Sequence, residues 1–192
     1  KVWRALWGLG EMPFYEVELA PFTYGGDGTT GARIREAQHK AVELIPGSGI
    51  ASINDLAYPY EYDEIHPRRK KEVGERLSYL ALNRTYGMDY LPCEGPRFKS
   101  YEVRGGEIEV AFYNGESGFS PWHDIVGFEI AGEDKVFHPA EIRRGTRLNT
   151  VIVKSGKVPA PVAVRYCFRD FQVGNFTGRR CLPVIPFRTD NW

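Results

Sequence analysis

The order of secondary-structure signals changes near residue 90, and this change limits the fold more than any other feature of the chain. Residues 13–20 alternate as a strand, residues 31–45 carry apolar side chains at helical spacing, and residues 49–53 read as a second strand. A helix is predicted over residues 67–86 after a long loop. This order predicts parallel strands joined by a right-handed crossover, and therefore an α/β fold.

Turn and cap residues mark the ends of both predicted helices. Thr30 is placed to cap the first helix, and Pro46-Gly47 ends it. Gly87 stands where a left-handed residue would close the second helix. The core-facing stripes are predicted to consist of Ile34, Ala37, Gln38, Ala41, Leu44 and Ile45 in the first helix, and of Val73, Leu77, Leu80 and Ala81 in the second.

The second half of the chain contains only short strand-like runs separated by turns. Their regular spacing favours an antiparallel β-sandwich, of jelly-roll or immunoglobulin-like type. We therefore divide the chain into an α/β part over residues 1–90 and a β-sandwich over residues 91–192. The predicted strands are 98–103, 107–113, 125–130, 150–153 and 162–168. The aromatic residues expected in the sandwich core are Phe112, Tyr113, Trp122, Phe128, Tyr166 and Phe168.

Charge and hydropathy exclude several classes of partner. The 25 basic and 25 acidic residues balance, and no basic stripe is interleaved with aromatics, so a nucleic-acid partner is not expected. No apolar run approaches the roughly 20 residues that span a bilayer, so a membrane partner is not expected. The chain opens without Met, and we expect that its true amino terminus and any export signal lie upstream.

The three cysteines do not form a metal-binding pattern. Cys93, Cys167 and Cys181 are widely spaced, with neither a Cys-x-x-Cys motif nor a histidine cluster nearby. We therefore expect no metal and no cofactor. Two states of the thiols stay open: a disulfide between Cys167 and Cys181 in an oxidising compartment, or three free thiols.

Asp63-Glu64-Ile65-His66, followed by Pro67, is the segment where spacing indicates chemistry. A histidine that serves as general base needs an acceptor, usually a carboxylate, on its second ring nitrogen. Asp63 stands three residues upstream of His66. Pro67 favours an extended residue before it and suits the first turn of a helix. His66 and Asp63 are therefore candidate catalytic residues; the alternative is a surface histidine and a turn aspartate.

Other candidate motifs are weaker. The Gly-rich loop over residues 25–31 lacks the Lys-Ser/Thr of a phosphate loop, so it is either a substrate-side loop or a turn that leads into the helix. Ser117 lacks the second glycine of a nucleophile elbow and is read as a turn serine. His123 and His138 have no acidic partner at a telling spacing and are expected in solvated loops.

Taken together, the motifs resemble the sialate O-acetylesterase family of SGNH-type serine esterases, over nearly the whole chain. The segments that carry the resemblance are Phe14-Tyr15, Leu19-Ala20-Pro21-Phe22, Ile34-Arg35-Glu36-Ala37-Gln38, Asn54-Asp55-Leu56, residues 63–77, residues 81–87, residues 127–134, Val164-Arg165-Tyr166 and residues 186–192.

This resemblance implies acyl transfer on O-acetylated sugars, with His66 as general base and Asp63 as the carboxylate that orients it. It implies the carboxy-terminal part of a flavodoxin-like parallel sheet. In this family the nucleophile lies in a Gly-x-Ser block near the start of the catalytic domain, and no serine of this chain stands in a comparable context. An upstream segment of the same enzyme is therefore expected to carry the nucleophile and to be a partner of this chain. A secreted or periplasmic location is expected.

Two departures and one alternative remain. Relatives often have Gln at the position of Glu18, and Ala-Trp at the position of Cys167-Phe168. Sialate and xylan acetylesterases share the catalytic arrangement, so the sugar stays open. The alternative is a noncatalytic carbohydrate-binding or scaffold fragment, which the lack of an upstream Gly-x-Ser segment would favour.

Overall fold

Two parallel strands joined by a helix form the first part of the chain. In the computed structural model, which describes residues 1–192, β1 (Phe14–Val17) pairs with β2 (Ser48–Ala51) in register from Phe14↔Ser48 to Val17↔Ala51. The crossover is α2 (Thr30–Leu44), and α3 (Lys70–Arg84) packs against both strands. The parallel pairing is confirmed, although the sheet has only these two strands.

The first helix differs from the prediction in its cap and in its buried face. Thr29, not Thr30, is the N-cap residue, and it makes no side-chain cap bond. Ile34 and Leu44, expected in the core, are 45% and 83% exposed. The buried residues of α2 include Ala32 and the charged Arg35. A two-stranded sheet covers only a narrow strip of a helix, so most of the apolar stripe faces outward.

The second helix begins three residues later than predicted. Arg69, not His66, precedes its first residue, so His66 lies in the loop and not at the helix terminus. Leu80 is fully buried, and Val73 packs against a small cluster of Ala20, Ile53 and Leu56, as the predicted stripe requires. Gly87 has a φ of +70°, the left-handed conformation expected just beyond the helix.

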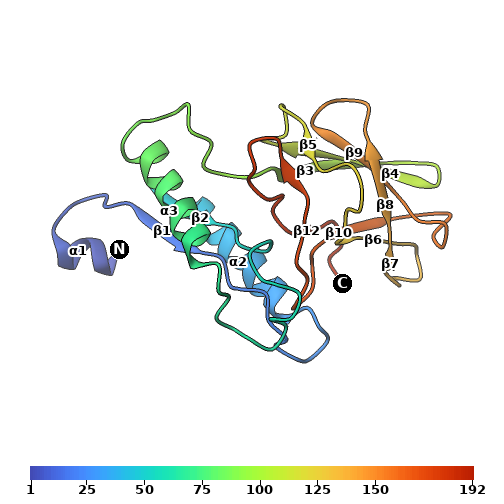
Figure 1. Cartoon of the computed structure of the whole chain (residues 1–192), viewed down its shortest axis with the longest axis horizontal. Coiled ribbons are helices and arrows are strands. Elements are labelled where there is room, and N and C mark those ends of the chain that lie inside the picture. The colour runs from blue at the N-terminus through green and yellow to red at the C-terminus, as the bar shows by residue number, and fades with distance from the viewer.

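A short helix, α1 (Val2–Trp7), precedes β1 and was not predicted. It buries none of its residues. Figure 1 shows it at the end of the molecule farthest from the β-rich part.

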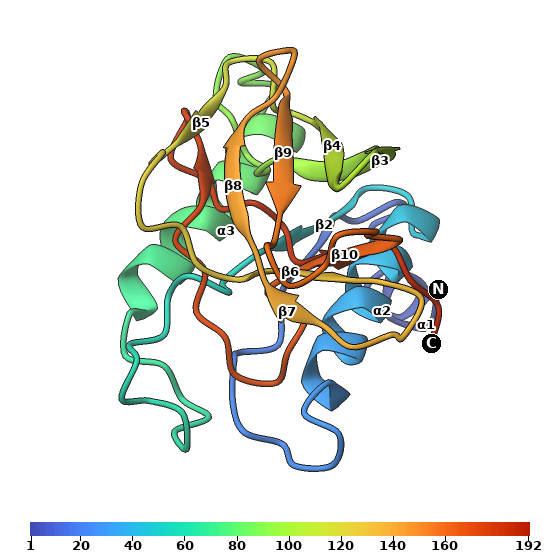
Figure 2. The same ribbon diagram turned by 90° about the vertical axis from the view of Figure 1, so that its right-hand side faces the viewer.

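The β-rich part contains two four-stranded antiparallel sheets and a short two-stranded one. One sheet has the order β3-β4-β9-β8 and the other β12-β10-β6-β7, while β5 pairs with β11. Figure 2 shows β8 and β9 running across the direction of β6 and β10. The strands are β3 (Arg97–Arg104), β4 (Glu107–Tyr113), β5 (Phe119–Ser120), β6 (Phe128–Ala131), β7 (His138–Pro139), β8 (Glu141–Arg144), β9 (Thr150–Lys154), β10 (Ala163–Tyr166), β11 (Thr177–Gly178) and β12 (Phe187–Arg188).

Both four-stranded sheets contribute to one core of 15 buried residues, as an antiparallel sandwich requires. Ile108 and Val151 come from the first sheet, and Ile130 and Val164 from the second, all fully buried. The five predicted strands correspond to β3, β4, β6, β9 and β10, although 125–127 lie outside β6. The strands missed are mostly two residues long, too short to show alternation.

Four of the six aromatic residues expected in the core are buried. They are Phe112, Phe128, Tyr166 and Phe168. Trp122 is half-buried at the edge of the core. Tyr113 was predicted wrongly: it is 44% exposed, with Arg97 and Lys99 over its ring, because it ends β4 on the outer face.

The three cysteines are free thiols, which selects one of the two states left open. Cys167 is buried and Cys181 exposed, while Cys93 is half-buried.

None of the helices is long and apolar enough to cross a lipid bilayer.

Candidate functional site

The loop over residues 52–69 leaves the carboxyl end of β2, where α/β folds place their functional residues. Glu61 fixes the loop from inside. It is 1% exposed, and its carboxylate accepts hydrogen bonds from the backbone N–H groups of Tyr58 (2.8 Å) and Arg68 (3.3 Å). Thr23 fixes the loop at Tyr62, because the N–H and the hydroxyl of Thr23 both donate hydrogen bonds to the carbonyl of Tyr62.

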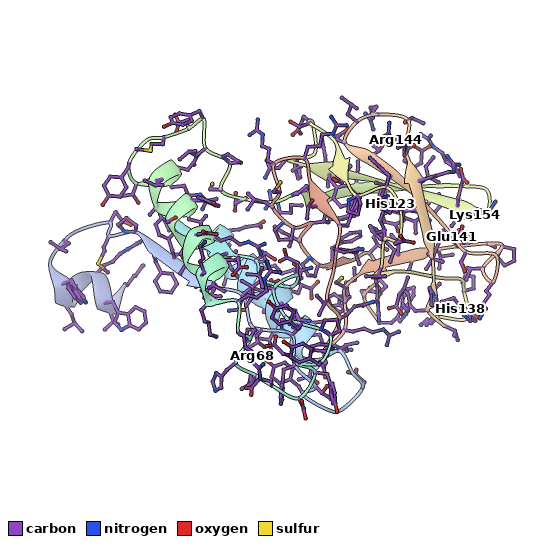
Figure 3. The ribbon with its side chains drawn as sticks, in the orientation of Figure 1. Arg68, His123, His138, Glu141, Arg144 and Lys154 are labelled. Carbon is purple, nitrogen blue, oxygen red and sulfur yellow. The ribbon has the colours of Figure 1, made fainter.

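The two candidate catalytic side chains lie on the exposed rim of this loop. Asp63 and His66 are both exposed, and no hydrogen bond joins them. The backbone N–H of His66 instead donates to Glu64 Oε1 at 3.0 Å, which closes a tight turn. Figure 3 labels Arg68, two residues further on, at the lower edge of the α/β part. The structure thus brings both residues to one loop without assembling the pair.

Two exposed tyrosines lie within the same loop, and no sequence motif pointed to them. Tyr58 and Tyr60 stack with ring centroids 5.3 Å apart and planes 6° apart. The guanidinium of Arg68 lies 5.6 Å from the Tyr60 centroid. Their rings are 40% and 58% exposed. Because stacked aromatic faces next to polar groups suit sugar rings, these residues widen the candidate site.

Glu18 is the buried charge at the carboxyl end of β1. Its Oε2 accepts hydrogen bonds from Ser52 Oγ and the Ile53 N–H, both at 2.7 Å, and its Oε1 lies 3.2 Å from His39 Nε2. Burial acts to raise the pKa of Glu18, but hydrogen bonding and charge from His39, with the charge of Arg35, lower it below its ordinary value. The extra carboxylate therefore holds the strand ends together.

Ser52 is not an activated nucleophile in this arrangement. Its single hydroxyl proton is donated to the Glu18 carboxylate at 2.7 Å, with Asn54 Oδ1 as a longer second acceptor at 3.2 Å, and no histidine accepts it. The cluster of Glu18, His39 and Ser52 was not predicted, because its members come from three elements that only the fold brings together.

Ser117 lies at a turn in which the Gly118 N–H donates to the Gly115 carbonyl, as predicted.

The Gly-rich loop is a turn that leads into α2. Asp27 Oδ1 accepts hydrogen bonds from the N–H and the hydroxyl of Thr29, at 2.9 and 2.7 Å. The N–H of Gly31 donates to Asp170 Oδ1 at 2.7 Å, which joins this turn to the β-rich part. His123 is exposed in a loop, as expected, whereas the same expectation was wrong for His138, which is half-buried in β7.

Comparison with solved structures gives a strong match. The whole chain aligns with a carbohydrate acetylesterase from Xanthomonas citri, at 40% sequence identity and a TM-score of 0.86. The chain covers 44% of that protein. No family model and no curated protein matches this chain. The chain is therefore similar in sequence and fold to under half of a carbohydrate acetylesterase.

The match agrees with the general class of enzyme that the sequence motifs resemble. The neighbour is described as a carbohydrate acetylesterase, with no sugar named.

Proposed function

We propose that this chain is part of a serine carbohydrate esterase that removes O-acetyl groups from sialic acid or a related acetylated glycan. The observation that carries the proposal is the match over the entire chain to an acetylesterase. The position of the Asp63/His66 loop, at the carboxyl end of a parallel strand, supports it.

The chemistry needs three groups, of which this chain would supply two. A serine oxygen attacks the acetyl carbonyl while His66 takes the serine proton. The ester bond to the sugar then breaks, and His66 passes the proton to the departing sugar oxygen. Water finally hydrolyses the acetyl-enzyme and releases acetate. Asp63 would accept a hydrogen bond from the second ring nitrogen of His66. Both side chains are exposed and make no hydrogen bond of their own, so no existing bond has to break before they meet in the complete site.

The serine is proposed to come from an upstream segment of the same enzyme. Exposed apolar surface on this chain supports such a partner. Trp3, Leu6 and Trp7 of α1 are 62–78% exposed, and a pocket of about 320 Å³ opens between α1, Phe14 and Ile45. A two-stranded parallel sheet also leaves both outer edges unpaired, whereas parallel sheets are normally covered.

Labelling with a fluorophosphonate probe tests the proposal directly. The complete enzyme should be labelled at one serine outside residues 1–192, as located by mass spectrometry of the peptides. This chain alone should not be labelled and should hydrolyse no ester. Labelling of Ser52, Ser117 or another serine of this chain would overturn the assignment. An unlabelled complete protein would favour the noncatalytic alternative.

A further inference from the structure

A groove of about 700 Å³ opens at one end of the β-sandwich, where β8 turns into β9. Its walls are the turn over 116–119, which leads into β5, the turn over 144–150, and Arg179 just after β11. Figure 3 labels Arg144 at the top of the β-rich part, far from Arg68 at the lower edge of the α/β part. The groove is therefore separate from the candidate esterase site.

Three arginines line the groove, and none of them has an acidic partner. The side chains of Arg144, Arg147 and Arg179 take part in no salt bridge and donate no hydrogen bond. Glu116 is the one carboxylate in the lining. Other arginines of the sandwich are paired, including Arg143 with Glu107 at 2.7 Å. Guanidinium groups left without partners around a hollow create a site for an anion.

Arg144 lies over an aromatic ring. Its guanidinium carbon lies 5.2 Å from the centre of the Trp122 ring. Trp122 in turn packs edge-on against Phe119 and Phe176, at centroid distances of 6.1 and 5.8 Å, so the core fixes its orientation. This contact uses no hydrogen bond of the guanidinium, so its N–H donors stay free for a carboxylate.

The turn that carries Arg147 is also rigid. Buried Glu109 accepts hydrogen bonds on Oε1 from the N–H and hydroxyl of Thr146, both at 2.7 Å, and from the hydroxyl of Thr150 at 2.8 Å. Asn149 joins the turn to β4 through its side-chain amide, which donates to the carbonyl of Phe112 at 3.1 Å. The basic groove is thus formed before any ligand arrives, which lowers the entropy cost of binding.

We propose that this groove binds a sugar residue that carries a carboxylate, such as a uronate or a sialate, within a glycan. The arginines would bind the carboxylate, and Asn149 and Ser117 line the groove as polar partners for hydroxyl groups. The volume suits a few sugar units. Equal numbers of acidic and basic residues over the chain give no extended basic track for nucleic acid. The site goes beyond the proposed esterase function and uses neither Asp63 nor His66.

Calorimetric titration of the complete protein tests the site. The probes are trigalacturonate and sialyllactose, with xylotriose and lactose as neutral controls. At least one carboxylated sugar should bind roughly tenfold or more tightly than its neutral control, and added NaCl should weaken it. Tight binding of trigalacturonate alone would identify a uronate as the ligand, and tight binding of sialyllactose alone would identify a sialate. Tight binding of both would show that the site recognises the carboxylate itself.

Single variants locate the site. Arg144→Ala and Arg147→Ala should each weaken binding of the carboxylated sugar by roughly tenfold, the effect of losing a charged hydrogen-bonding group. Arg143→Ala is the matched control. Arg143 is adjacent to Arg144 in the sequence, but its side chain lies on the other face of β8, where it pairs with Glu107. It should change the affinity less than twofold. Aryl acetate hydrolysis should be unaffected by Arg143→Ala, and thermal unfolding should show that each variant remains folded.

Three results would overturn the proposal. The first is equal binding of charged and neutral sugars, including no binding of either. The second is equal weakening by Arg143→Ala and Arg144→Ala. The third is tighter binding of a single-stranded oligonucleotide than of either carboxylated sugar.

Discussion

The carboxylate of Asp55 accepts two parallel hydrogen bonds from the guanidinium of Arg76, at 2.6 and 2.7 Å. Arg76 Nη1 also donates to the carbonyl of Ser52 at 2.6 Å. Ser52 and Asp55 both follow the last residue of β2, and Arg76 lies in α3, so this pair joins the start of the functional loop to the helix that packs against it.

Breaking this ion pair should destabilise the protein strongly. The two side chains are 16% and 10% exposed, so Asp55→Ala leaves a nearly buried guanidinium without its partner. The expected loss in the free energy of unfolding is about 3–5 kcal/mol. Denaturant titration measures it. Glu75→Ala, which removes an exposed pair with Lys71, should cost less than about 0.5 kcal/mol. Similar losses for both variants would contradict the assigned role of Asp55.

Loss of the candidate base should stop catalysis without unfolding the protein. In the complete enzyme, His66→Ala should lower the rate constant for aryl acetate hydrolysis by roughly 10³ or more, and Asp63→Asn by roughly 10² to 10⁴. Circular dichroism should show unchanged folding, because both side chains are exposed. A rate within about threefold of wild type for His66→Ala would end the assignment.

Glu64→Gln separates the orienting carboxylate from its neighbour. The Glu64 carboxylate accepts the His66 N–H at 3.0 Å, and a glutamine carbonyl can accept the same bond. We therefore expect a much smaller loss of rate than for Asp63→Asn, in the same assay. If Glu64→Gln proved the more damaging change, Glu64 would be the orienting carboxylate.

Glu18 should make stability depend on acid. Its pKa in the folded protein lies below the ordinary value of 4.5, so its contribution is complete above that value and is lost as the pH falls through the folded pKa. Urea unfolding at about pH 7 and about pH 3 should show a smaller loss of stability for Glu18→Gln than for wild type. Glu141→Gln, at an exposed carboxylate, should keep the wild-type loss. Equal losses in all three proteins would exclude Glu18 as a source of acid sensitivity.

The thiols should differ sharply in reactivity. Burial raises the pKa of Cys167 to about 12, so almost no reactive thiolate forms at neutral pH. Cys181 is exposed. Iodoacetamide applied to the folded protein should therefore alkylate Cys181 and spare Cys167, as read by peptide mass spectrometry. Denaturant should expose Cys167 to the reagent, and equal labelling of both thiols in the folded protein would contradict the burial.

The parallel strand pair, both main helices and the main sandwich strands could be predicted from the sequence. Their signals are local: alternation in β4, helical spacing in α3 and the turn residue Gly87. The start of α3 and the cap of α2 were misplaced by one to three residues. The hydrogen bonds that Glu61 accepts from Arg68 and Asp27 accepts from Thr29 hold these residues outside the two helices. Neither bond follows from helix propensity.

The sequence by itself predicted the candidate chemistry: the spacing of Asp63 and His66 and the resemblance of the motifs to an esterase family require no coordinates. Only the tertiary structure decided which residues distant in the sequence come into contact. It placed Glu18 beside Ser52, 34 positions away, and Arg144 over Trp122, on separate strands and turns. Such contacts depend on how helices and strands pack against one another. They do not depend on the spacing of apolar residues within one element, so sequence patterns do not predict them. Packing also placed Arg144, Arg147 and Arg179 around one groove without acidic partners. They come from β8, from the turn between β8 and β9, and from the segment after β11, and only the pairing of the strands brings these segments together.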